Sequence, residues 1–111
     1  MSHPMSLVIS NCPPGEAERL AQALVEGRLA ACVTLSPVKS VYIWQGEVCV
    51  DQEVTLTAKV SEAGVEACVA RLLELHPYEL PEVLCVPVDH ARSHEPYCEW
   101  VRQACRDPTG G

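Results

Sequence analysis

"VKSVYIWQGEVCVDQEVTLTAKV", residues 38–60, predicts two β-strands joined by a tight turn. Residues that favour strands fill both halves. Gln45-Gly46 separates the halves, and glycine can supply the positive φ that a two-residue turn needs. The return strand is expected from Glu47 to Val60, with its apolar side chains on one face because they follow a period of two. That face would carry Val48, Val50, Val54, Leu56, Ala58 and Val60.

Upstream of the hairpin, residues 6–10 (SLVIS) predict a first strand, and residues 29–35 (LAACVTL) predict the start of the second. Pro37 is expected to interrupt that second strand, which resumes over 38–44. Between the two strands, apolar residues at helical spacing predict a helix that Gly27 helps to end. The stripe of this helix comprises Ala17, Leu20, Ala21, Leu24 and Val25.

Downstream, Ser61 is expected to cap a second helix. Pro77 is expected to end that helix at His76, because a residue before proline disfavours helical geometry. Residues 82–88 (EVLCVPV) predict a fourth strand, in which Pro87 suits a sheet edge. The expected apolar stripes are Val65, Val69, Leu72, Leu73 and His76 in the second helix, and Tyr97, Trp100, Val101, Ala104 and Cys105 in a last helix.

The order of these elements is β-α-β-β-α-β followed by a terminal helix, which predicts an α+β fold. It is typical of a ferredoxin-like βαββαβ sandwich, here with a long hairpin between the second and third strands and a C-terminal helix. Strands one and three would be central, and strands two and four, which carry the prolines, would be edges. We expect a single domain over residues 6–106, with a flexible N-terminus (1–5) and a flexible tail (107–111).

The charge and hydropathy of the chain argue against two classes of partner. The net charge is -7, from 15 acidic and 8 basic residues, and no run of Lys or Arg occurs. A nucleic-acid partner is not expected, because such proteins carry a basic footprint. No apolar run approaches the roughly 20 residues of a membrane helix, so membrane insertion is not expected either. The N-terminus is too polar for a signal peptide, and a cytoplasmic protein is predicted.

The chain contains seven cysteines, an odd number, and no C-x-x-C pair. A disulfide framework or a zinc finger is therefore a poor interpretation. Most of the thiols are expected to be reduced and buried as small apolar groups, and folding should require no disulfide. Cys12 and Cys49, which lie near predicted turns, are the two expected to be accessible.

The hairpin is long for a chain of this size. Each arm has about 15 residues, or roughly 45–50 Å, whereas a compact chain of this length is about 35 Å across. The overhanging tip would carry Val41, Tyr42, Ile43 and Trp44, and exposed apolar patches of this kind usually mark interfaces. We expect a homo-oligomer, with Tyr42, Trp44 and Trp100 as interface residues. The alternative is that the last helix, with Trp100, folds over the tip.

Four segments resemble the CutA family of divalent-cation tolerance proteins: "ALVEGRLAACVTLSP", "SVYIWQGEV", "EVTLTAKVS" and "LHPYELPEVLCVPV". The resemblance runs in order over roughly residues 6–105. It implies a ferredoxin-like subunit in a tight homotrimer built around the hairpins, an association with copper and other divalent cations, and a role in metal tolerance or in the response to metal ions. The trimer also resembles the PII signalling proteins. The alternative is therefore a regulatory or scaffolding trimer that binds a small molecule or a partner protein at clefts between subunits.

"HPYELPEV", residues 76–83, is the candidate site. Its two prolines make it a stiff joint between helix and strand, and that stiffness would hold His76 and Glu82 in place. Imidazole suits copper or zinc and carboxylate tolerates them, while Cys12 would add a soft ligand if the first strand ends beside the joint. By resemblance, His76 matches the family's H-P-Y histidine. The position before it, where some members have a second histidine, is Leu75, and the family's cysteine would fall near Ile9. We therefore expect copper or another divalent cation to be weakly bound.

No catalytic signature such as G-x-S-x-G, a P-loop or H-E-x-x-H occurs, so an enzyme is not expected. An enzymatic role would depend on a cleft between subunits lined by Lys59, His76 and Glu82. Tyr78 and Glu79 are further candidates for such a cleft, or for hydrogen bonds within the joint. A second polar cluster precedes the last helix and comprises Asp89, His90, His94 and Glu95.

Overall fold

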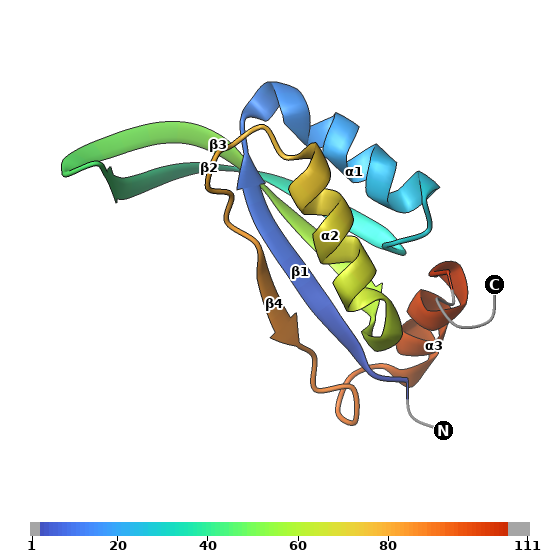
Figure 1. Cartoon of the computed structure of the whole chain (residues 1–111). Helices are drawn as coiled ribbons and strands as arrows, with labels where there is room; N and C mark the ends of the chain where they lie inside the picture. Colours follow the sequence, from blue (N-terminus) through green and yellow to red (C-terminus); the bar gives the residue numbers. More distant parts are fainter. Residues whose placement is uncertain (1–2, 107–111) are drawn as a thin grey trace.

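The computed structural model describes residues 3–106. Its strands are β1 (Met5–Cys12), β2 (Cys32–Trp44), β3 (Glu47–Ser61) and β4 (Leu84–Pro87), and its helices are α1 (Ala17–Glu26), α2 (Val65–Leu75) and α3 (Glu95–Ala104). Short 3₁₀ turns at Pro14–Glu16 and Glu62–Gly64 precede α1 and α2. The predicted α+β, ferredoxin-like order is confirmed (Figure 1).

One antiparallel sheet has the strand order β2-β3-β1-β4. The predicted central strands, β1 and β3, and the predicted edges, β2 and β4, are therefore confirmed. The expected interruption at Pro37 is wrong, because Pro37 pairs with Val54 within a continuous β2. An edge strand tolerates proline, since the missing N–H need not serve a ladder on the outer side. β1 begins at Met5, one residue earlier than expected, and Met5 is buried. The predicted tail at 107–111 lies outside the described residues.

Helices α1 and α2 cover one face of the sheet and form the main core with it (Figure 1). The largest side chains of this core come from Val8 of β1, Leu20 and Leu24 of α1, Leu56 of β3 and Leu72 of α2. The predicted stripe of α2 is wrong at Leu73, which is 49% exposed, and Cys68 is buried instead. The helix turns 100° per residue, so Cys68 and Leu72, four apart, share a face that Leu73 leaves. Ser61 precedes the turn into α2 but makes no capping side-chain hydrogen bond.

The opposite face of the sheet, which we call the open face, is covered at one end by α3, the one helix among residues 3–106 that packs there. Met5, Cys98, Val101 and Cys105 form a small core there. Tyr97 and Trp100 continue the predicted stripe of α3, but each residue is more than 40% exposed in the single subunit, and their rings contact each other at 5.5 Å between centroids. No helix of the described residues is long and apolar enough to cross a membrane.

The β2–β3 hairpin extends beyond the rest of the sheet. Pairing with β1 ends at Cys12 and Val54, so residues 47–53 of β3 pair only with β2. The molecule measures 49 × 29 × 20 Å, and the overhang accounts for its length. The tip lies at the opposite end from α3 (Figure 1), so the alternative in which Trp100 folds over the tip is wrong.

Helix α1 ends in a Schellman motif, which its hydrogen bonds define. Arg28 N–H donates to the carbonyl of Val25, and Leu29 N–H donates to that of Leu24, both at 2.9 Å. The motif requires a left-handed residue after the cap, and Arg28 takes that conformation with φ 57°, whereas Gly27 does not. The Arg28 guanidinium donates to the carbonyl oxygens of Gln103 and Ala104 at 3.0 Å, so this residue also caps α3 and fastens it to α1.

Arg28→Ala should lower the free energy of unfolding by about 1–2 kcal/mol, because two charge-assisted hydrogen bonds at an exposed site are lost. Arg28→Gly should recover about 1 kcal/mol of that loss, since glycine relieves the left-handed strain. Urea denaturation at one fixed protein concentration measures both values. Arg71→Ala, which removes an exposed i,i+3 pair with Glu74 at 3.4 Å, is the control and should change stability by less than about 0.5 kcal/mol. Equal losses for the Arg28 and Arg71 variants would contradict the role of Arg28.

Candidate functional site

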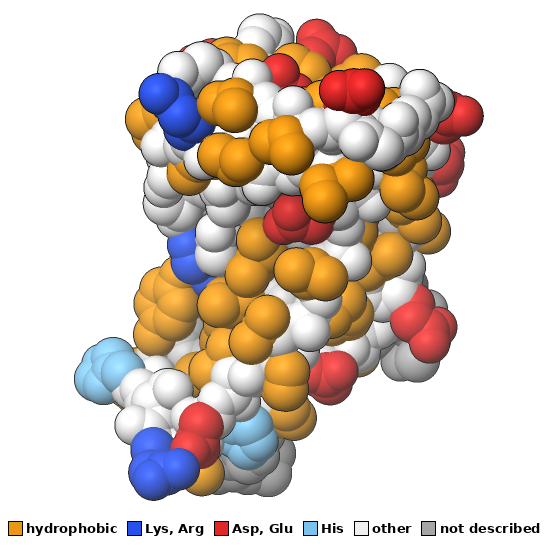
Figure 2. Space-filling view, turned by 90° about the vertical axis from the view of Figure 1, so that its left-hand side faces the viewer, with side chains coloured by type: hydrophobic (Ala, Val, Ile, Leu, Met, Phe, Trp, Pro, Cys, Tyr) orange, Lys and Arg blue, Asp and Glu red, His pale blue; other side chains and the backbone are white. Residues whose placement is uncertain are grey.

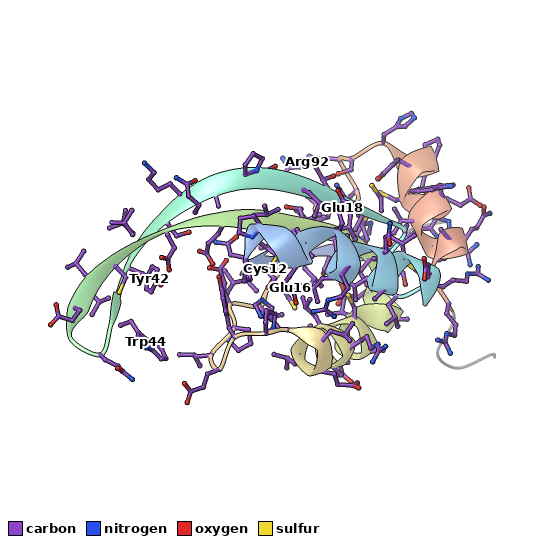
Figure 3. The ribbon with its side chains drawn as sticks, turned by 90° about the horizontal axis from the view of Figure 1, so that it is seen from above. Cys12, Glu16, Glu18, Tyr42, Trp44 and Arg92 are labelled. Carbon is purple, nitrogen blue, oxygen red and sulfur yellow. The ribbon has the colours of Figure 1, made fainter. Side chains whose placement is uncertain are left out.

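The inner side of the curved hairpin encloses a hollow of about 610 Å³. In Figure 3 the arc of β2 and β3 bends around this side, and Tyr42 and Trp44 lie along its inner edge. The opposite wall is the segment that joins α2 to β4. The residues that line the hollow are Asn11 of β1, Ser40 to Trp44 of β2, Asp51 and Glu53 of β3, and Tyr78, Glu79, Leu80 and Glu82 of the joint.

His76 fixes the joint against the end of β1. As predicted, α2 stops before Pro77: its last residue is Leu75, and His76 follows it as an extended cap with ψ 133°. His76 is only 8% exposed, and the backbone N–H of Tyr78 donates to its Nδ1 at 3.2 Å. Nδ1 is therefore the unprotonated nitrogen, and Nε2 donates to the carbonyl oxygen of Asn11 at 2.9 Å. Both ring nitrogens have partners, so His76 serves the fold of the joint in the single subunit.

A tyrosine hydroxyl connects the joint to the hairpin. Tyr78 donates from its hydroxyl to Oε2 of Glu53 at 2.7 Å. Burial raises the pKa of Tyr78, and the hydrogen bond to the Glu53 carboxylate raises it further, because both favour the neutral phenol. Nearer the tip, Tyr42 donates to Asp51, and this hydrogen bond raises the pKa of Tyr42 to about 12.

The hollow carries negative charge without a compensating cation. Four carboxylates line it, from Asp51, Glu53, Glu79 and Glu82, and its lining includes no Lys or Arg. The ion pairs within residues 3–106 join other carboxylates, namely those of Glu16, Glu74, Asp89 and Glu95. Glu53 is 8% exposed, which is unusual for a carboxylate that has no cationic partner.

Cys12 lies close to the joint, as the predicted metal site requires, but its thiol is not accessible. β1 does end beside the joint, since the Asn11 carbonyl accepts from His76. The predicted accessibility of Cys12 is wrong, because the side chain is fully buried under α1 (Figure 3). Burial raises the pKa of the Cys12 thiol, with the carboxylates of Glu53 and Glu16 adding to the effect, and a raised pKa opposes the thiolate that binds metals.

The structure separates the other candidates. No group of three or more His, Cys, Asp or Glu within residues 3–106 is placed to hold a metal ion, so Cys12, His76 and Glu82 form no ready-made site in one subunit. Lys59 pairs with Leu7 on the open face, where its ammonium donates to Thr34, and it does not line the hollow. Asp89 pairs with Arg92 at 2.7 Å, in a loop outside the hollow.

Asp51 and Glu53 are the site residues that the sequence analysis missed. The hairpin register could have revealed them, because it pairs Ser40 with Asp51 and Tyr42 with Cys49, and thus places both carboxylates on the face of Tyr42. The burial of Glu53 depends on Tyr78 of the joint, and nothing near Glu53 in the sequence indicates that contact.

A ferredoxin-like sheet with helices on one face, and with an overhanging hairpin around a hollow, places this subunit in the class of PII-like folds. A family model described as "CutA1 divalent ion tolerance protein" matches residues 6–104. The chain therefore belongs to the CutA1 divalent ion tolerance protein family, and the resemblance noted in the sequence is confirmed.

Individual relatives agree with this assignment. The divalent-cation tolerance protein CutA of Thermus thermophilus is 40% identical over 99 residues, which cover 87% of this chain and 94% of that protein. Human Protein CutA is 40% identical over 101 residues, but the match covers only 55% of its length against 89% of this chain. The solved structure of a PII-like protein CutA from Nostoc sp. PCC 7120 superposes with a TM-score of 0.90 at 45% identity, covering 92% of this chain and 98% of that one.

The two tyrosines of the hollow offer a matched test of the joint. Tyr78→Phe should lower the free energy of unfolding by about 1–3 kcal/mol, because it leaves an oxygen of the buried Glu53 carboxylate without a donor. Tyr42→Phe removes a hydroxyl that bonds the exposed Asp51, and it should change stability by less than about 0.5 kcal/mol. Urea denaturation of the two variants at equal concentration provides the comparison. A loss for Tyr42→Phe as large as that for Tyr78→Phe would contradict a specific role of the Tyr78–Glu53 bond.

Proposed function

We propose that the protein is a homotrimer that binds divalent cations weakly and takes part in tolerance of, or the response to, metal ions. The observation that supports assembly most strongly is the apolar surface of the hairpin tip. Family membership supports the cation role, and the resemblance discussed above supplies the number three. The proposal assigns no catalytic step, and a cytoplasmic location remains a prediction.

The hairpin tip argues for a second copy of the chain as its partner. Ile43 and Val48 are at least 70% exposed in the single subunit, and Val41, Tyr42, Trp44 and Val50 are also exposed. Hydrophobic side chains gather on the side of the molecule drawn in Figure 2, over the hairpin and over β4, where Leu84 and Val86 are exposed. Burial of one such large side chain stabilises an assembly by roughly 1.5–3 kcal/mol, so a neighbouring subunit has much to gain here.

Weak metal binding is consistent with the partners that His76 already has. A cation at Nδ1 must displace the N–H of Tyr78, which costs about 0.5–1.5 kcal/mol. Glu82, whose carboxylate is exposed, can supply oxygen ligands nearby, whereas Cys12 would have to leave the core and lose its proton. We propose an affinity for copper or zinc in the micromolar range, about -8 kcal/mol.

The hollow favours a second candidate function, a PII-like regulatory trimer that binds a small molecule. Its volume of about 610 Å³ lies within the range of roughly 300–1,000 Å³ that is typical of small-molecule sites. A metal ion alone would occupy only a small part of that space.

The assembly is tested by light scattering coupled to gel filtration. The protein should elute with about three times the subunit mass, and Trp44→Asp should shift it toward the monomer, because a charge enters an apolar contact. Leu73→Asp is the control, since Leu73 is an exposed apolar residue on α2, away from the hairpin, and this variant should remain trimeric. A wild-type monomer at micromolar concentration, or a trimeric Trp44→Asp, would refute assembly through the tip.

The cation role is tested by calorimetric titration of the reduced protein with copper and with zinc. We expect saturable binding at one equivalent per subunit, weakened at least about tenfold in His76→Ala, or 1.4 kcal/mol on the affinity scale. His94→Ala, which alters an exposed histidine outside the hollow, should leave the curve unchanged. Light scattering must show the same assembly for each variant. An unchanged curve for His76→Ala would remove His76 from the site.

A further inference from the structure

We propose that the open face of the sheet is the surface on which the hairpin of a second copy docks, with Lys59 facing the partner subunit's Asp51. This inference rests on the homotrimer just proposed, and it names the surface that receives the tip. Three observations carry it together: the symmetry of a ring of three, an apolar strip that the single subunit leaves uncovered, and opposite charges on the two surfaces.

The symmetry of the ring calls for a second surface besides the tip. A closed ring of three identical subunits uses two different surfaces of each, because every contact joins one surface to the other. The hairpin tip supplies the first. Its most exposed aliphatic side chains form two cross-strand pairs, Val41 with Val50 and Ile43 with Val48, and each of the four is at least 58% exposed. The receiving surface must therefore be apolar and must lie elsewhere on the subunit.

An apolar strip on the open face meets this requirement. Leu84 and Val86 of β4 are 54% and 41% exposed, and they pair with Ile9 and Leu7 of β1, which are partly buried. Helices α1 and α2 pack on the opposite face of the sheet. The tip of the same subunit projects beyond the sheet, so the strip is left for a second copy.

The charges of the two surfaces are complementary. Between Ser40 and Glu53 the hairpin carries three carboxylates and no Lys or Arg. Where β2 and β3 adjoin the strip, over residues 32–38 and 55–61, the one charged side chain on the open face is Lys59. Its ammonium donates to Thr34 and forms no ion pair with a carboxylate of residues 3–106. Lys59 can therefore receive an anionic group from a second copy, and such a pair would select the register of docking.

Asp51 is the carboxylate of the hairpin best placed to reach a second copy. It is exposed, whereas Glu53 is 8% exposed and already accepts from Tyr78. Glu47 lies at the turn, beyond the aliphatic pairs. The Tyr42 hydroxyl donates to Asp51 and so holds its carboxylate beside the tip. A carboxylate that is already held loses less side-chain entropy when it forms an ion pair.

Light scattering coupled to gel filtration of two matched variants tests the surface. Val86→Asp should elute near the mass of one subunit, because a charge would enter the apolar contact. Val25→Asp is the control, since Val25 is also 41% exposed but lies on α1, across the sheet, and this variant should keep three times the subunit mass. Circular dichroism should show both variants folded. A folded, trimeric Val86→Asp would overturn the inference.

Reversal of the two charges tests the ion pair independently. At low salt, Lys59→Glu and Asp51→Lys should each raise the concentration at which half of the trimer dissociates by at least about tenfold. The double variant should return that concentration to within about threefold of the wild type, because the pair is restored with opposite polarity. Glu66→Lys, a reversal at an exposed position near the start of α2, should change it by less than about twofold. A double variant that assembles no better than either single variant would overturn the inference.

Failure of this inference can be distinguished from failure of the proposed function. A wild-type monomer refutes the homotrimer, and the docking surface with it. A wild-type trimer that Trp44→Asp dissociates, but that Val86→Asp and Lys59→Glu leave intact, retains assembly through the tip and refutes only the open face as its docking surface.

Discussion

The structure depends on one uninterrupted antiparallel register between β2 and β3. The ladder runs from Cys32–Lys59 to Trp44–Glu47 without a bulge, and it is closed by Gln45 and Gly46, both with positive φ. Because β1 ends its pairing at Val54, the remainder of this ladder must project from the sheet. The same register places Tyr42, Asp51 and Glu53 on one face. The exposed apolar tip and the charged wall of the hollow are thus consequences of a single strand pairing.

The joint from His76 to Glu82 turns this projecting hairpin into a site. Without an opposing wall, the inner face of the hairpin would be a solvated ribbon, and Glu53 would be exposed. His76 holds the joint to β1, and Tyr78 closes the contact through Glu53. The prolines restrict the backbone, so little conformational entropy is lost when the wall forms. His76 is the best candidate for a metal ligand in the sequence, but in the structure it mainly holds the joint, and thus the wall of the hollow, against β1.

Periodicity, together with the positions of proline and of Gly27, was sufficient to predict the order of the elements, the central strands and the ends of α1 and α2. They failed where burial depends on the direction a helix faces: Leu73 and Trp100 continue apolar stripes but leave the core, and Cys68 and Cys98 replace them. Cys12 was misjudged because, although a turn follows it, its side chain lies on the face of β1 that packs against the helices. Glu53 was not predicted as a site residue, since its burial requires a tyrosine 25 residues away. Such long-range contacts leave no local pattern in a single sequence.

The chemistry of the hollow limits which cations it can select. Its available ligands are carboxylate oxygens, because the imidazole of His76 is engaged and the thiol of Cys12 is buried and protonated. Oxygen ligands alone suit hard cations and ammonium groups, whereas copper gains its selectivity from nitrogen and sulfur. Selective copper binding therefore requires a rearrangement of the joint, and that rearrangement would loosen the wall on which Tyr78 and Glu53 depend.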